Sequence, residues 1–377
     1  MATTRMGTSR ELDAKLAELQ DLYEAGRDHD VIDLGDSILA TPVPAPRRGE
    51  VSLFLAMANL RLRRIQVGEQ RLNEAWTDLA VGGDPVLRAE CMITQSQLAI
   101  MKQSPQAVGL AEDALAAVRT LKPVPSRVEV RALNALAGAH VRAGSWAAAI
   151  SCYERAIECA GPLFDMRRQA LMATEVAIAY RELGMVDRSV LYATRAVKLV
   201  ETLGAPTTLA IAENNLGWIL IGVGELGLAR LHLERSMQLT EAANLESGRC
   251  HVLLSMCELN LAEGKFSEAR SFAEEALVYA ERCGESSSAA QAHVWLGRVA
   301  ASLGEADVVD SEFALAIDWM KRNGESERLV RCHAYYAEIL ERRGEATRAY
   351  EHVKSAVSLL MPKSRRMAMR SASSLSG

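Results

Sequence analysis

Residues 216–236 read LGWILIGVGELGLARLHLERS, and this stretch contains the pattern that decides the fold. On both sides of Gly224, apolar residues recur at spacings of three and four, which is typical of amphipathic helices. A glycine between two such segments favours a helix end, because glycine adopts the left-handed conformation without the steric cost of a Cβ. The stretch therefore predicts a helix, a tight turn and a second helix.

The same turn recurs every 40 residues along the chain. The glycines that predict it are Gly144, Gly184, Gly224, Gly264, Gly304 and Gly344. A second set of turn residues follows the same period, at Gly204, Asn244, Gly284 and Gly324. Asparagine fits this set because it tolerates positive φ better than most residues. Each 40-residue unit is predicted to be a helix, a tight turn, a helix and a short loop.

Small residues also repeat in this register. Seven positions before each turn glycine stand Ala137, Ala177, Gly217, Cys257, Gly297 and Ala337. Twelve positions after it stand Ala156, Ala196, Ser236, Ala276, Ala316 and Ala356. Small side chains at fixed points let two helix backbones approach closely, while large neighbours fill the remaining space. The units are therefore predicted to be antiparallel helical hairpins that stack in tandem.

These residues resemble the tetratricopeptide repeat (TPR). Besides residues 216–236, the fragments LNALAGAHVRAGSWAAAISCYERA (133–156) and LGRVAASLGEADVVDSEFALA (296–316) carry the pattern. The usual repeat has about 34 residues. The longer unit is similar to the repeats of bacterial peptide-pheromone receptors, kinesin light chains and mitotic-spindle adaptors. The resemblance implies an all-α fold, an α-α superhelix or TPR solenoid, with six repeats over residues 126–361.

The two ends of the chain depart from the period. Residues 11–125 predict three degenerate hairpins or a cap, with a separate helical bundle as the alternative, and Ser104 stands where a turn glycine is expected. We expect residues 1–10 to be disordered. The segment 362–377 is rich in serine and arginine and has no acidic residue, so we expect a basic, disordered tail.

Composition narrows the function classes. The net charge of −5 gives no overall attraction to nucleic acid or to an anionic membrane, and no apolar run reaches eighteen residues. The seven cysteines are odd in number and no pair has the C-x-x-C spacing, which favours buried, reduced thiols. We expect a cytoplasmic protein, and the resemblance suggests a bacterial one.

No catalytic or cofactor motif stands out. Residues 222–227 match G-x-G-x-x-G by letters, but helices flank them where the dinucleotide fingerprint needs a strand. His293 and His333 are 40 residues apart, so we interpret them as equivalent repeat positions, with a metal site as the alternative. The basic run Arg61, Arg63, Arg64 and Arg71 is interpreted as a solvated helix face. We therefore expect no enzyme, no cofactor and no direct nucleic-acid binding.

The resemblance implies a partner in a concave groove that the first helix of each repeat lines. Residues 214–217, N-N-L-G, are similar to a segment of the long-repeat proteins in which asparagine holds the backbone of an extended peptide. Matching offsets from the turn glycine gives these candidates for binding a peptide or protein: Arg131, Asn134, Thr174, Arg181, Asn214, Asn215, Trp218, His251, Glu258, Trp295, Arg298, Arg331, Tyr335 and Glu338.

Three functions remain open at this stage. The first is a protein–protein interaction scaffold or adaptor that binds a protein segment or peptide. The second is a peptide-pheromone-type receptor that regulates an output domain or partner. The third is a structural homodimer that assembles through the terminal repeats.

Overall fold

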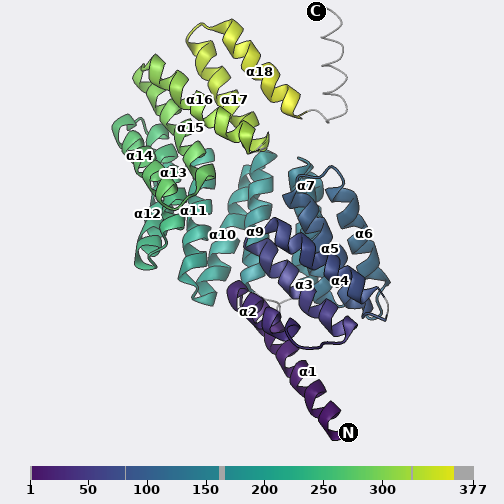
Figure 1. The fold of residues 1–377 in the computed structure, drawn as a ribbon. Coiled ribbons are helices and arrows are strands. Elements are labelled where there is room, and N and C mark those ends of the chain that lie inside the picture. The colour runs from purple at the N-terminus through teal and green to yellow at the C-terminus, as the bar shows by residue number, and fades with distance from the viewer. Residues whose placement is uncertain (1, 81, 161–165, 324–325, 361–377) are drawn as a thin grey trace, which may run out of the picture. The chain divides into compact units, whose positions relative to one another are not determined.

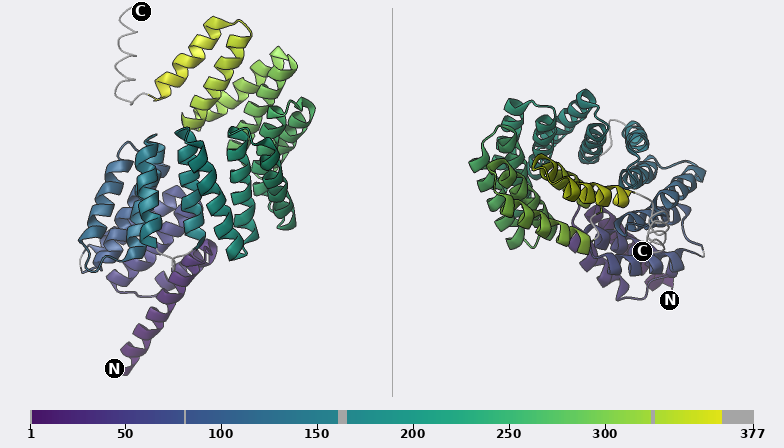
Figure 2. Two further views of the ribbon diagram at one scale, coloured as in Figure 1. Left: turned by 180° about the vertical axis from the view of Figure 1, so that it is seen from behind. Right: turned by 90° about the horizontal axis from the view of Figure 1, so that it is seen from above.

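The computed structural model describes residues 2–80, 82–160, 166–323 and 326–360, and these residues form eighteen α-helices (Figure 1). Consecutive helices pack side by side as antiparallel hairpins (Figures 1 and 2). The predicted all-α fold, a TPR-type solenoid of helical hairpins, is confirmed. The chain divides into two compact units, which meet between Tyr192 and Ala193.

The helices of the first unit, the last of which crosses into the second, are α1 (Ala2–Glu24), α2 (Asp28–Leu39), α3 (Ala45–Arg61), α4 (Ile65–Leu79), α5 (Pro85–Met101), α6 (Ala107–Thr120), α7 (Ser126–Arg142), α8 (Trp146–Ala160), α9 (Met166–Glu182) and α10 (Val186–Leu203). The second unit continues with α11 (Pro206–Gly222), α12 (Leu226–Ala242), α13 (Glu246–Ala262), α14 (Phe266–Arg282), α15 (Ser286–Leu303), α16 (Ala306–Arg322), α17 (Ser326–Arg342) and α18 (Ala346–Leu360).

The predicted turns have the conformation that the sequence requires. All six turn glycines have positive φ, between 69° and 82°. At Gly224 the backbone N–H donates to the carbonyl of Ile221, and the N–H of Glu225 donates to that of Leu220, so the last carbonyls of α11 are satisfied. In the second set, Gly204, Asn244 and Gly284 also have positive φ. Gly324 lies outside the described residues.

The small residue before each turn lies where two helices of a hairpin touch. A Cβ on Gly217 would lie 2.6 Å from Cγ of Leu233 on α12, and a Cβ on Gly297 would lie 2.8 Å from the ring of Phe313 on α16. Leu233 and Phe313 are fully buried. The large residue of the second helix therefore occupies the space that the glycine leaves free.

The first unit shows where the sequence was harder to interpret. Two of its turns use non-glycine residues with positive φ, Arg63 and Gln103, which no 40-residue period marks. Helix α1 begins at Ala2, so the prediction that residues 1–10 are disordered was wrong. The predicted tail, 362–377, lies outside the described residues. Among the described residues, no helix is long and apolar enough to cross a lipid bilayer.

Candidate functional site

The second unit contains a cavity of about 770 Å³ between its first helices α11, α13 and α15, closed at one end by the loop after α12. Five of the predicted binding residues line it: Asn214, Asn215, Trp218, His251 and Glu258. They meet because α11 and α13 are the first helices of adjacent repeats and pack directly against each other. The 40-residue period therefore brings the same helix face of both repeats to one cavity.

Other residues of this cavity were not predicted from the sequence. They are Thr207, Ala210, Ile211, Thr240, Asn244, Leu245, Gly248, Val252, Leu254, Ser255 and Gln291. Asn244 was noted only as a turn residue, although its 40-residue recurrence also marks a loop that borders the groove. The sequence reasoning considered helix positions alone and so missed the loop.

The walls of this cavity combine apolar surface with neutral polar groups. Ile211 is 51% exposed, which is unusual for a large aliphatic side chain on a helix that faces other helices. The side-chain oxygen Oδ1 of Asn214 is buried and accepts no hydrogen bond from any described residue. Burial lowers the pKa of His251 below its ordinary value, so this imidazole is neutral at pH 7. Glu258 is then the one ionised residue among those that line the cavity.

A second cavity, of about 430 Å³, lies further along the same unit. It is lined by residues of α13, α15 and α17 and by the start of α16, and includes the predicted residues Arg298, Tyr335 and Glu338. The guanidinium of Arg298 lies between the rings of Trp295 and Tyr335, with its Cζ 4.4 Å and 4.2 Å from the two ring centroids. Cation–π attraction thus fixes this arginine at the cavity wall.

The remaining predicted residues are dispersed. Arg131 and Asn134 line a small cavity of about 200 Å³ in the first unit. The charge of Arg131 is neutralised there by Glu90, at 2.7 Å, and the Arg131 side chain is only 13% exposed. Thr174 donates its hydroxyl to the carbonyl of Ala170 within α9. Two arginines complete the set, the half-buried Arg181 on α9 and the exposed Arg331 on α17.

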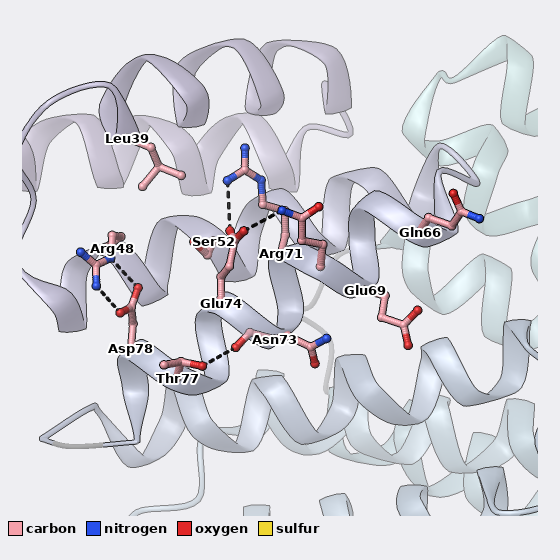
Figure 3. A pocket seen from close by; sticks show the side chains of 11 residues that line it. Leu39, Arg48, Ser52, Gln66, Glu69, Arg71, Asn73, Glu74, Thr77 and Asp78 are labelled. Atoms are coloured by element: carbon pink, nitrogen blue, oxygen red, sulfur yellow. Dashed lines mark hydrogen bonds and ion pairs between the residues drawn. The ribbon is translucent and has the colours of Figure 1, made fainter.

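A third large cavity, of about 760 Å³, is polar and lies beside α4 in the first unit (Figure 3). Its two arginines already have acidic partners. Arg48 donates from Nε to Asp78 at 2.6 Å, and Arg71 contacts both Asp36 at 2.7 Å and Glu74 at 3.1 Å. Charges that are paired within the chain leave little attraction for an added anion, and we assign no ligand to this cavity.

Histidines occupy one recurring position between the helices of a hairpin. His293 of α15 contacts Glu312 of α16 at 2.6 Å, and His333 of α17 contacts His352 of α18 at 2.8 Å, Nδ1 to Nδ1. Both pairs are 19 residues apart, which confirms that His293 and His333 are equivalent repeat positions. Burial first, and then His352 and Lys321, lower the pKa of His333 to about 4.

A metal ion has no evident ligand set among these groups. Within the described residues, no group of three or more histidine, cysteine, aspartate or glutamate side chains lies close enough to hold one. The cysteines are free thiols, and Cys91, Cys250, Cys257 and Cys332 are buried. The histidine pairs are therefore interpreted as packing contacts between the two helices of a hairpin.

No protein-family model matches the sequence, and no curated protein does. Solved structures do resemble it. A Rap protein complexed with Competence and Sporulation Factor superimposes with a TM-score of 0.73 at 13% identity, over 93% of this chain and 98% of that one. The apo form of the quorum sensor NprR from B. thuringiensis gives 0.65 at 16% identity, over 94% and 100%. Aspartyl phosphate phosphatase F from Bacillus subtilis gives 0.65 at 11%, over 93% and 94%. At these identities the likeness establishes the fold, and it agrees with the TPR resemblance of the sequence.

Proposed function

We propose that this chain is a TPR-type adaptor or sensor that binds an extended peptide or protein segment in the cavity between α11, α13 and α15. The observation that carries the proposal is Asn214, whose buried Oδ1 has no hydrogen-bond donor among the described residues while its side chain lines the cavity. A buried acceptor without a donor costs about 1–3 kcal/mol, so a ligand that supplies an N–H gains that amount back.

The other lining residues suit a peptide. An amide both donates and accepts, so Asn214 and Asn215 can bond to the backbone of a segment of any sequence. Trp218 and Ile211 supply apolar contact for side chains, and tryptophan is enriched among residues that dominate binding energy. A volume of about 770 Å³ is within the range of ligand cavities and holds a few residues.

The fold of the similar structures supports the same proposal. Among them, a Rap protein is complexed with Competence and Sporulation Factor, and a Rap conjugation gene regulator of the plasmid pLS20 is in complex with the Phr* peptide. The sensor form of the proposal, in which the peptide changes how the chain acts on an output domain or partner, follows from this parallel. We infer a cytoplasmic, non-catalytic role, and the four buried thiols are consistent with a reducing compartment.

Affinity selection from a pool of randomised heptapeptides tests the proposal. The wild-type chain should retain defined sequences, and Asn214→Leu should lower the affinity for them roughly tenfold, as expected for the loss of a buried hydrogen bond. Gln238→Leu is the matched control, because Gln238 is an exposed amide on α12 outside the lining set, and it should bind as the wild type does. No enrichment by the wild type, or equal affinity of Asn214→Leu, would reject the site.

Self-assembly into a homodimer through the terminal repeats is the other candidate. It is favoured by α18, where Tyr350, Val353, Val357 and Leu360 are each at least 46% exposed on the last helix that the structure describes. Sedimentation at increasing concentration distinguishes the two functions, since a dimer raises the mass without any peptide.

A further inference from the structure

Arg298 is held in place by rings rather than by acids. Trp295 and Arg298 are one turn apart on α15, and Tyr335 on α17 is 40 residues after Trp295, so the repeat places the second aromatic beside the first. The two ring centroids are 6.4 Å apart, and the Cζ of Arg298 is within 4.4 Å of both. This arrangement covers the flat faces of the guanidinium. Its N–H groups then lie at the edge, in the plane that suits bidentate bonding to a carboxylate.

The charge of Arg298 is not neutralised as its neighbours' charges are. Of the other charged residues that line the 430 Å³ cavity, Glu338 pairs with Arg342 at 2.5 Å, Arg343 pairs with Asp310 at 2.9 Å, and Glu305 pairs with Arg270. Arg298 forms no hydrogen bond or ion pair with any residue that the structure describes. A cavity wall thus carries an oriented, uncompensated positive charge.

The two cavities of the second unit lie on successive turns of the same helices. On α13, Glu258 lines the 770 Å³ cavity and Leu261, three residues on, lines the 430 Å³ cavity. On α15, Gln291 lines the first and Arg298 the second. Three residues of helix span only about 4.5 Å, so one extended segment can reach from the first cavity into the second.

We propose that the cavity at Arg298 is a carboxylate subsite: the peptide bound at Asn214 presents an acidic group, which the edge of the Arg298 guanidinium binds bidentately. This inference rests on the proposed function and adds the chemistry of the ligand. The carboxylate is either the C-terminus of the peptide or an aspartate or glutamate side chain. Glu258 in the neighbouring cavity gives the bound segment a direction, since an acidic group is repelled there and attracted at Arg298.

The experiment uses the full chain and the same randomised heptapeptide pool. Wild type should enrich peptides that carry a carboxylate in the last positions, and Arg298→Gln should bind the enriched peptides at least tenfold more weakly, since a hydrogen bond to a charged group contributes about 1.5–3 kcal/mol. Arg298→Lys, which keeps the charge but not the planar fork, should lose part of the affinity. Glu338→Gln, which removes the nearest competing acid in the cavity, should bind as well as or better than wild type.

Each enriched peptide is then made with its C-terminus amidated, and separately with aspartate or glutamate replaced by its amide. Loss on amidation identifies the C-terminal carboxylate, and loss on the side-chain change identifies the acidic residue. Thermal melting checks that Arg298→Gln folds. Enrichment of neutral or basic peptides whose affinity is unchanged in Arg298→Gln would overturn the subsite and leave the proposed function standing. No enrichment by wild type would overturn both.

Discussion

The substitution Gly217→Ala tests whether close helix contact, rather than chance, places a small residue before each turn. Alanine is favoured over glycine in a helix by roughly 0.8–1.0 kcal/mol. Against this, the new Cβ would lie 2.6 and 2.7 Å from the side chain of Leu233 and 3.2 Å from the carbonyl oxygen of Ala229. Leu233 is fully buried and cannot swing aside. Overpacking of this kind costs about 1–3 kcal/mol, and the backbone contact places the cost near the upper end.

The net effect of Gly217→Ala is expected to be a destabilisation of about 1–2 kcal/mol, which lowers the melting temperature by roughly 3–6 °C for a unit of this size. Gly227→Ala on the partner helix is the matched control. A Cβ there has no heavy atom within 4 Å, so this variant should be as stable as wild type or slightly more so. Adding Leu233→Ala to Gly217→Ala should cost less than Leu233→Ala alone. A Gly217→Ala chain that melts at or above the wild-type temperature would refute the reasoning.

Three further outcomes are expected. The pKa of His333 is lowered from 6.5 to about 4, so its contribution to stability is fully present above pH 6.5 and is lost as the pH falls towards 4. The shift corresponds to roughly 3 kcal/mol before solvent screening, of which we expect about half, and His352→Phe should flatten this pH dependence in urea unfolding. Burial raises the pKa of Cys332 to about 12, so this thiol should react with Ellman's reagent only after unfolding, whereas the half-buried Cys283 should react in the native protein; equal rates would contradict the burial. Glu213 is fully buried and contacts His232 at 2.6 Å, so Glu213→Ala should destabilise the chain by about 3 kcal/mol, and calorimetry that finds no loss would contradict the contact.

The repeats could be predicted from the sequence because their signals are local. A turn that needs positive φ selects glycine or asparagine directly, and Gly217 and Gly297 mark close contacts at a fixed distance from the turn. Arg63 and Gln103 adopt the same conformation with ordinary side chains, so the surrounding packing and not the residue type determines those turns. The first hairpins were accordingly interpreted without a clear register.

The candidate site was predicted in part. Asn214 and Trp218 lie on helices whose facing sides follow from the period, whereas Asn244 lies in a loop whose path does not. Arg131 was expected to face a partner, but it pairs with Glu90, which is 41 residues earlier and outside the 40-residue register. The ring stack around Arg298 joins two repeats, so its geometry depends on how the repeats pack.

Photo-crosslinking from the cavity wall tests the central claim most directly. A benzoylphenylalanine at position 211 replaces the exposed Ile211 that lines the 770 Å³ cavity, and the same group at the exposed position 231 on α12 is the control. With a labelled peptide from the affinity selection, irradiation should label the chain from position 211, excess unlabelled peptide should abolish the labelling, and position 231 should give none. Equal labelling from both positions, or labelling from position 231 alone, would contradict binding in the cavity between α11, α13 and α15.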